Sequence, residues 1–353
     1  MPDRDDTRAA PGRRRTDRRA LLLATLGAGA TLGTPSPAPA QPRQGGGGGS
    51  ASGSLPAVAS FSILGDLVAT VGGERVSVRS VAGPDVDAHG FQARPSDAVA
   101  IRDAAVVVRN GLGFDPWMDR LIRASGGRAR VVTATEGVTP IMVEGGHHHG
   151  HGHSHGGHSH GGERRRGAGG AEAVRVPDPH AWQDVRNAPT YLRNIAEGLA
   201  AADPSGAAAY RANAEAASAR MAALDAWVRE QVATVPEARR KVLTSHDAFG
   251  YFGASYGVRF LAPQGLSTEA EPSAAGVAAL IRQVRAEGLS AVFVENMTRP
   301  ATLERLAREA GVRVRGRLYA DALSAPGGPA ATYEAMVRHN VGLMVPAMRG
   351  DAA

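Results

Sequence analysis

One long apolar stripe, with alternating strand and helix patterns on both sides, constrains the fold of this chain most. Between Asp203 and Pro236 the sequence is rich in Ala, and its apolar residues recur at spacings of three and four. The stripe consists of Tyr210, Ala214, Ala217, Met221, Leu224, Val228 and Val232. We predict a helix over 203–236, roughly 45 Å long at about 1.5 Å per residue. Asp203 is its expected N-cap and Pro204 its first helical residue. A helix of this length predicts a rigid strut between two lobes.

Short apolar strands alternate with amphipathic helices on both sides of this helix. Before it, AVASF, ERVSVRSVAG, AAVVVRNG and ARVVTATEGV are typical of strands. After it, RKVLTS, GVRFLAP, SAVFVEN and VRVRGRL are typical of strands that alternate with helices. This pattern predicts parallel sheets covered on both faces. We therefore predict an α/β fold of two doubly wound lobes, over 55–202 and 237–353. Ligands of such sheets bind beyond the carboxyl ends of the strands, so the interlobe cleft is the expected site.

The first forty residues have the pattern of an export signal. A basic stretch ending in Arg18-Arg19 precedes an apolar run from Ala20 to Leu32, and Ala38-Pro39-Ala40 follows. The apolar run is too short to span about 30 Å of hydrocarbon as a helix. The Arg pair is typical of a twin-arginine signal, and an ordinary Sec signal is the alternative. We expect cleavage after Ala40, a flexible leader over 41–54 and a periplasmic location.

Composition excludes several classes of function. The chain has 353 residues and a formal charge of +6, but its first forty residues carry seven Arg and four Asp, so half of that charge lies in the signal. The remaining chain is nearly neutral, which argues against a nucleic-acid-binding surface. There are no cysteines. This excludes disulfides, thiolate metal sites, cysteine nucleophiles and a lipid-modified cysteine within this sequence.

Eight of the twelve histidines fall in one tract. Residues 145–170 are rich in Gly and Ser and have no hydrophobic periodicity, which predicts a mobile surface loop. Imidazoles on such spacers can bind several metal ions weakly. The predicted auxiliary ligands are His147, His148, His149, His151, His153, His155, His158 and His160. The alternative is a dispensable segment that binds metal only incidentally.

Three other histidines and one acid share a topological position. His89, His180 and His246 each lie in a loop where a strand ends or a helix begins, and Asp321 follows a strand. A single loop histidine is more often a surface residue, but three with an acid favour a site. Three imidazoles and one carboxylate suit tetrahedral Zn²⁺, at roughly 2.0–2.2 Å from each donor. They suit Mn²⁺ less well, because it prefers more oxygen. His339 lies on a predicted helix and is not included.

The stretches that carry these residues resemble the periplasmic metal-binding proteins of zinc and manganese ABC transporters. They include DVDAHGFQARPSD, VPDPHAWQDVRNA, LTSHDAFGYFGASYGV, FVENMTRPATLERLAREAG and LYADALSAPGGPAATYEAMVRHN, and the resemblance covers nearly all of the chain after the signal. It implies two α/β lobes joined by a long helix, with His89, His180, His246 and Asp321 as the metal ligands. Manganese members of this family often have Glu at the third position, so His246 favours zinc. Ala88 stands where some zinc members have an acidic residue.

The resemblance implies an extracytoplasmic protein that captures Zn²⁺ and delivers it to an ABC permease, with no catalytic residues. It also implies a monomer and admits a periplasmic zinc chaperone as a further partner. Two alternatives stay open: a zinc hydrolase, and an extracellular zinc buffer or adhesin without a permease. Glu295 and Asn296 end a predicted buried strand, where they could orient a ligand imidazole or serve as ordinary hydrogen-bonding groups.

Overall fold

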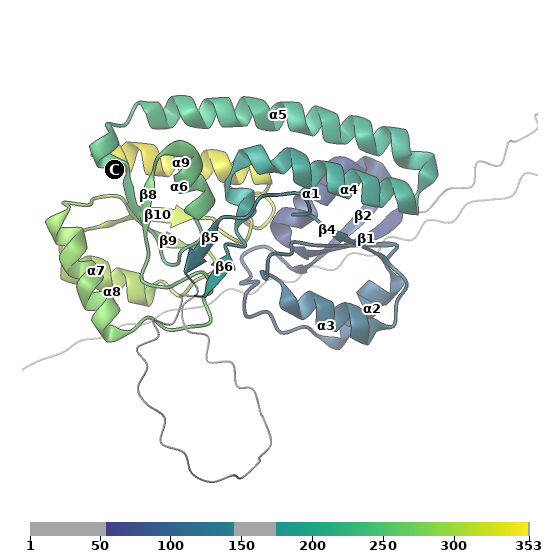
Figure 1. Cartoon of the computed structure of the whole chain (residues 1–353), viewed down its shortest axis with the longest axis horizontal. Coiled ribbons are helices and arrows are strands. Elements are labelled where there is room, and N and C mark those ends of the chain that lie inside the picture. Colours follow the sequence, from purple (N-terminus) through teal and green to yellow (C-terminus); the bar gives the residue numbers. More distant parts are fainter. Residues whose placement is uncertain (1–53, 145–173, 352–353) are drawn as a thin grey trace, which may run out of the picture. The chain divides into compact units, whose positions relative to one another are not determined.

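The first half of the chain builds a four-stranded parallel sheet. The computed structural model describes residues 54–144 and 174–351, so the predicted signal, nearly all of the leader and the histidine tract lie outside the described residues. The strand order is β2-β1-β3-β4, and every pair is parallel. The three valines of β3 are fully buried, as expected for a strand covered on both faces. Helices α1 and α4 lie on one side of this sheet and α2 and α3 on the other (Figure 1). The elements are β1 (Leu55–Phe61), α1 (Ser62–Gly72), β2 (Val76–Ala82), α2 (Pro95–Asp103), β3 (Val106–Arg109), α3 (Pro116–Ser125), β4 (Arg130–Thr133) and α4 (Ala188–Ala202).

The second half repeats this architecture. Its four strands are parallel in the order β10-β9-β7-β8. All four residues of the central strand β9 are buried, which again shows a sheet with both faces covered. The α/β fold with parallel sheets is therefore confirmed, while the lobe boundaries at 55–202 and 237–353 stay a prediction. The elements are β7 (Lys241–Leu243), α6 (Gly250–Tyr256), β8 (Arg259–Leu261), α7 (Ala274–Ala286), β9 (Val292–Glu295), α8 (Ala301–Ala310), β10 (Val314–Leu318) and α9 (Tyr333–Arg349).

The long helix between the two sheets is present as α5 (Ala207–Ala233), and all seven residues of its apolar stripe are buried. It packs on α1 and α4 of the first half and on α9 of the second (Figure 1). Its start agrees with the prediction in part: Asp203 is the N-cap and Pro204 the first residue of a 3-10 turn (Pro204–Gly206), and Gly206 is the N-cap of the α-helix that follows. The Asp203 carboxylate makes no capping bond and instead accepts hydrogen bonds from Arg75, Ser205 and Tyr210.

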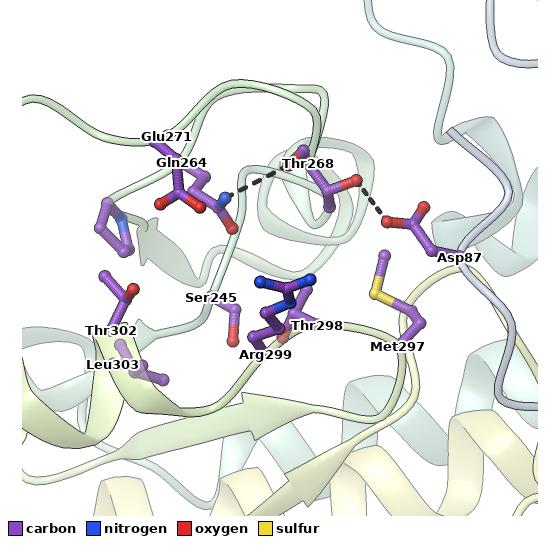
Figure 2. Close-up of a pocket in the computed structure, with 11 residues that line it drawn as sticks. Asp87, Ser245, Gln264, Thr268, Glu271, Met297, Thr298, Arg299, Thr302 and Leu303 are labelled. Carbon is purple, nitrogen blue, oxygen red and sulfur yellow. Dashed lines mark hydrogen bonds between the residues drawn. The ribbon is translucent and has the colours of Figure 1, made fainter. Parts of the chain in front are cut away.

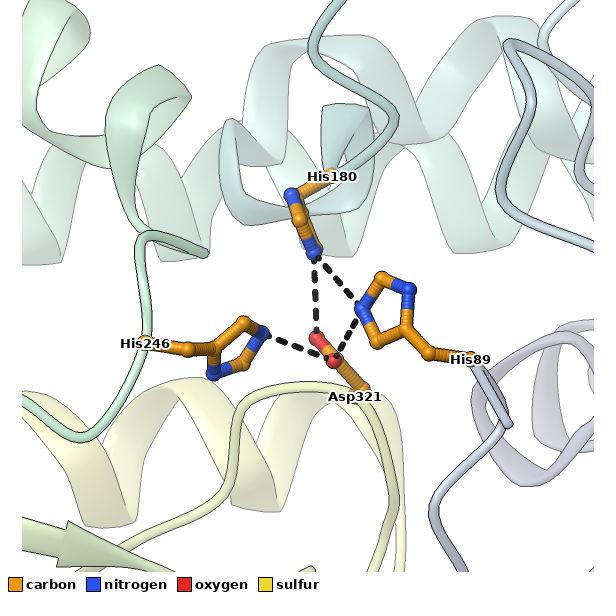
Figure 3. Close-up of side chains that lie close together, drawn as sticks. All are labelled: His89, His180, His246 and Asp321. Carbon is orange, nitrogen blue, oxygen red and sulfur yellow. Dashed lines mark hydrogen bonds and ion pairs between the residues drawn. The ribbon is translucent and has the colours of Figure 1, made fainter. Parts of the chain in front are cut away.

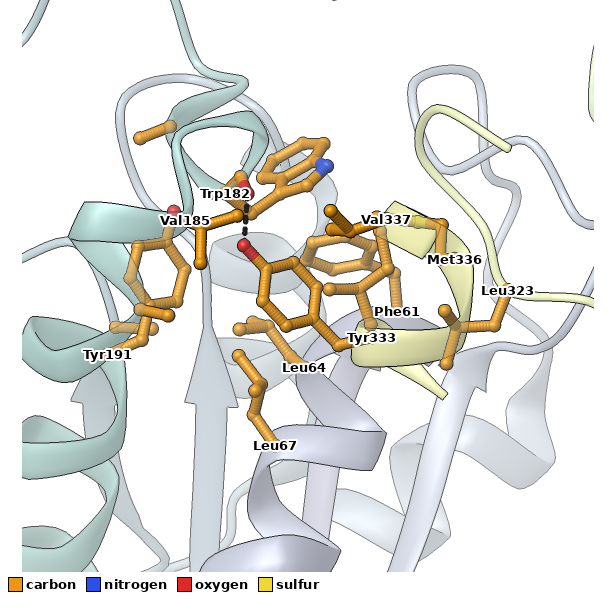
Figure 4. Close-up of a cluster of buried hydrophobic side chains, with 14 of the residues drawn as sticks. Phe61, Leu64, Leu67, Trp182, Val185, Tyr191, Leu323, Tyr333, Met336 and Val337 are labelled. Atoms are coloured by element: carbon orange, nitrogen blue, oxygen red, sulfur yellow. Dashed lines mark hydrogen bonds between the residues drawn. The ribbon is translucent and has the colours of Figure 1, made fainter. Parts of the chain in front are cut away.

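One continuous apolar core connects the two halves. Figure 4 shows Tyr333 of α9 packed among Phe61, Leu64 and Trp182, which come from the first half of the chain. The Tyr333 hydroxyl also donates a hydrogen bond of 2.5 Å to the Trp182 carbonyl. Burial on this scale ties the C-terminal helix to the first sheet as well as to its own, which favours small motions between the lobes.

Two very short strands were not predicted. β5 (Met142–Glu144) and β6 (Arg175–Pro177) pair in antiparallel fashion on either side of residues 145–173. Among the described residues, no helix combines the length and apolar character needed to cross a membrane.

Candidate metal centre

The four predicted ligands come from four separate loops. His89 lies between β2 and α2, His180 directly precedes a 3-10 turn before α4, His246 follows β7 and Asp321 follows β10. Because the strands of each sheet are parallel, the loops after β2, β7 and β10 all leave from carboxyl ends. The structure brings the four side chains together, with one ligand atom from each within 4.8 Å of the others (Figure 3).

The spacing of these atoms fits a four-coordinate ion. Asp321 Oδ2 lies 3.1 Å from His89 Nε2 and 3.0 Å from His246 Nε2. His180 Nε2 lies 3.3 Å from His89 Nε2 and 3.8 Å from Asp321 Oδ1. Donors at tetrahedral corners about 2.1 Å from a metal would lie about 3.4 Å apart. The measured separations cluster around that value, so the donor set fits a divalent ion.

The polar atoms of this cluster lack ordinary partners. The side chains of His180, His246 and Asp321 are fully buried, and that of His89 is 6% exposed. Among the described residues, His246 Nε2 and both oxygens of Asp321 have no hydrogen-bond partner. Burying such atoms unpaired is costly, and a shared cation is the simplest group that would satisfy all of them.

Two carboxylates fix the orientation of two of the imidazoles. His180 Nδ1 donates to Asp178 Oδ1 over 2.8 Å, and His246 Nδ1 donates to Glu295. The other oxygen of Glu295 accepts the backbone N–H groups of Ser245 and His246, at 2.9 and 3.1 Å. With Nδ1 protonated by these contacts, each neutral ring presents the lone pair of Nε2 to the centre. Glu295 therefore orients an imidazole, whereas the Asn296 side chain donates to Asp85 and to the Ala322 carbonyl.

The charges in the centre shift the pKa values of two candidate ligands. Burial acts to lower the pKa of His246, but the carboxylates of Glu295 and Asp321 outweigh it and raise that pKa well above its usual value. Burial acts to raise the pKa of Asp321, but His246 and His180 outweigh it and hold that pKa well below its usual value. The centre is thus strongly negative when its imidazoles are neutral, and it stabilises a cation.

Aromatic and amide groups support the ligands from behind. The Trp182 ring packs edge-on against His180, with ring centroids 5.3 Å apart. Trp182 Nε1 and Gln183 Nε2 both donate to the Ala320 carbonyl, at 2.9 and 2.8 Å. They hold the residue before Asp321 and so fix where the carboxylate points. His339 lies apart, where its Nε2 donates to the Arg317 carbonyl over 3.0 Å.

Sequence reasoning missed Asp178, although a signal was present. Asp178-Pro179-His180 and Asp87-Ala88-His89 share the pattern Asp-x-His. In both, an oxygen of the Asp accepts the backbone N–H of the His over 2.9 Å, which is the geometry of an Asx-turn. The eight predicted auxiliary histidines, His147 to His160, lie outside the described residues.

Comparison with known proteins identifies the family. Residues 57–347 match the family described as zinc-uptake complex component A, periplasmic. The manganese-binding lipoprotein MntA of Halalkalibacterium halodurans is 32% identical over 291 residues, which cover 82% of this chain and 87% of the relative. The iron-binding protein YfeA of Yersinia pestis is 27% identical over 285 residues, covering 80% and 83%. Among solved structures, the periplasmic zinc-binding protein TroA from Treponema pallidum matches with a TM-score of 0.72 and 26% identity, covering 84% of this chain and 99% of that one.

These relatives share a role and differ in the metal that their names give. The family comprises metal-binding proteins that serve ABC transporters outside the cytoplasm, so the alternative of a zinc hydrolase is wrong. The family match covers both sheets, the long helix and all four loops of the centre. The chain therefore belongs to this family of periplasmic, metal-binding substrate-binding proteins of ABC transporters.

Proposed function

We propose that this protein captures Zn²⁺ outside the cytoplasmic membrane and delivers it to an ABC permease. The observation that carries the proposal is the donor set: three imidazole nitrogens and one carboxylate, with ligand atoms that all lie within 4.8 Å of one another. Neutral nitrogen donors in a four-coordinate site suit Zn²⁺, whereas Mn²⁺ prefers more oxygen donors. His89, His180, His246 and Asp321 are the proposed ligands.

The names of the relatives point to other metals as well. Two of them are named for manganese and iron, and a structural neighbour is named for zinc. The proposal of zinc for this chain depends on the chemistry of its own third ligand, His246. A carboxylate there would give two oxygen donors instead of one and weaken the preference for zinc.

Competition titration of the exported protein tests this choice. Most nitrogen and oxygen sites bind Zn²⁺ more tightly than Mn²⁺, so a higher zinc affinity alone is not diagnostic. The diagnostic quantity is the ratio of the two affinities in the wild type and in His246→Glu. We expect this ratio to fall at least tenfold in the variant. A ratio that is unchanged, or a wild type that prefers Mn²⁺, would contradict the assignment of zinc.

The auxiliary tract and the route of export complete the proposal. His147 to His160 would collect Zn²⁺ in weak, fast-exchanging sites and raise its concentration near the centre by tethering. The signal over 1–40 would direct export, with cleavage after Ala40, and the mature protein would act as a monomer that a zinc chaperone could load. N-terminal sequencing of the secreted protein checks the cleavage. Zinc uptake into vesicles that contain the permease distinguishes delivery from the remaining alternative, an extracellular buffer or adhesin.

A further inference from the structure

His89 borders a cavity that the other three candidate ligands do not line. A cavity of about 400 Å³ is lined by His89, Phe114, Pro179, Leu266 and Glu269, and none of the other three ligands lines it. The side chain of His89 is 6% exposed, whereas those of the other three are fully buried. An ion that enters or leaves through this cavity must pass His89. The contacts that keep His89 in place would therefore control how fast the ion exchanges.

The two Asp-x-His turns are alike in backbone and differ in what the carboxylate does. In the turn of His180, Asp178 Oδ1 accepts both the backbone N–H and the ring Nδ1, which locks the imidazole. In the turn of His89, Asp87 Oδ1 accepts only the backbone N–H over 2.9 Å. The other oxygen of Asp87 is bound to a different residue.

That second oxygen reaches across to the other half of the molecule. Asp87 Oδ2 accepts a hydrogen bond of 2.6 Å from Thr268 Oγ1, in the loop that follows β8 (Figure 2). Gln264 Nε2 donates to the Thr268 carbonyl over 3.4 Å and so braces this loop. Gln264 in turn forms an isolated parallel bridge with His246. A chain of contacts thus runs from His246 to His89 without passing through the metal position.

We propose that the Asp87–Thr268 hydrogen bond is a latch that holds His89 at the mouth of the centre and sets the rate of metal release. The inference rests on the proposed function and adds to it the residues that control exchange. Asp87 and Thr268 are positioning residues, since neither contributes a ligand atom. Both are half-buried and lie in loops, so the latch can open without disturbing the buried core.

Replacing the Thr268 hydroxyl tests the latch. Thr268→Val removes the donor with little change of shape, and we expect Zn²⁺ to leave about tenfold faster, the size typical of a hydrogen bond to a charged group. Thr268→Ser restores the donor and should restore the wild-type rate. Thr302→Val is the matched control, because Thr302 lines the same pocket as Thr268 but has no hydrogen bond to Asp87. Its release rate should equal that of the wild type.

The measurement is stopped-flow release of Zn²⁺ to a chelator, together with hydrogen exchange of the metal-free proteins. Exchange over residues 85–91 should be faster in Thr268→Val than in the wild type, which reports the latch without any metal. Equal release rates in Thr268→Val and the wild type, both fully loaded, would overturn the latch and leave the proposed function intact. Equal acceleration in Thr302→Val would also overturn it. A wild type that binds no divalent ion would instead overturn the proposed function.

Discussion

At the scale of single residues, the centre depends on carboxylates that do not bind the ion. Asp178 and Glu295 each hold the Nδ1 of a candidate ligand, so the Nε2 atoms of His180 and His246 converge on Asp321. Such partners orient the ligand ring and raise its basicity. Glu295 also accepts two backbone N–H groups, which an amide side chain could not do while still accepting from His246.

We expect Glu295→Gln to weaken zinc binding and to shift its pH dependence. The loss should be about 10- to 100-fold in affinity, the usual effect of removing such a partner. Metal binding requires neutral His246, whose pKa the carboxylates of Glu295 and Asp321 raise. Without Glu295 that pKa falls, so protons compete only at lower pH and the decline in affinity moves to lower pH. Competition titrations from pH 5 to 8 measure both effects, and an unmoved pH profile would contradict the role of Glu295.

The raised pKa of His246 also links stability to pH. A group whose pKa is raised on folding stabilises the metal-free protein below its unfolded pKa, near 6.5, and loses this contribution as pH rises through the folded pKa. Zn²⁺ competes with this proton for His246, so the affinity of the protein for Zn²⁺ rises as the pH rises through the same range. We therefore expect the increase in Tm caused by Zn²⁺ to be larger at pH 8 than at pH 6. Calorimetry of the metal-free and loaded protein measures it, and equal increases at both pH values would refute the linkage.

At the scale of elements, the long helix α5 contributes to stability through its buried apolar stripe. Leu224 is fully buried, whereas Glu230 on the same helix is exposed. We expect Leu224→Ala to lower the free energy of unfolding by about 2–5 kcal/mol. Glu230→Ala should change it by less than about 0.5 kcal/mol. Denaturant unfolding of the metal-free proteins measures both.

The strut supplies no candidate ligand, so zinc affinity at low temperature should be the same in both α5 variants. A large loss of affinity in fully folded Leu224→Ala would show that α5 does more than support the lobes.

The sequence predicted the helices and strands whose apolar residues follow a clear pattern, and it missed the elements that lack such a pattern. The stripe of α5 and the apolar strands of both sheets repeat often enough to identify their type. β5 and β6 are as short as β7 and β8, but they lie outside the alternation of strands and helices and pair only with each other. Asp203 is the N-cap of the 3-10 turn before α5, but its carboxylate makes no capping bond, because Arg75, Ser205 and Tyr210 donate to it instead. The same limit applies to the centre: the residues that could bind metal were predicted, whereas the role of Thr268 depends on a tertiary contact with Asp87. Asp178, in contrast, was marked by the local pattern Asp-x-His and could have been predicted.

At the scale of the whole molecule, the shared core favours a small motion. Phe61 and Trp182 from the first half pack with Tyr333 of the second, and α5 contacts both halves. Opening the lobes widely would expose this apolar surface, at about 25 cal/mol per Å². Exchange by movement of a loop such as the one that carries His89 exposes far less. Small-angle scattering should therefore show nearly equal radii of gyration for the metal-free and loaded forms. A difference of several ångströms between the two radii of gyration would contradict the role of α5 as a rigid connection between the lobes.

The strand that follows the histidine tract lies beside the cavity at His89. This strand, β6, contributes Val176 and Pro177 to the cavity that His89 borders. Ions held loosely near this mouth would be presented to the centre at a high effective concentration. The tract should then affect how fast zinc binds when it is scarce, and not how tightly the centre holds it.

Replacing all eight histidines from His147 to His160 by Ser, at constant length, separates these effects. We expect the stoichiometry to fall to one Zn²⁺ per chain with the affinity of that ion unchanged, because its ligands lie elsewhere in the chain. Loading at submicromolar zinc should slow. Equilibrium dialysis gives the stoichiometry and stopped-flow mixing gives the rate. If the extra ions disappear while the loading rate stays the same, the tract binds zinc only incidentally, and the cavity at His89 fills directly from solution.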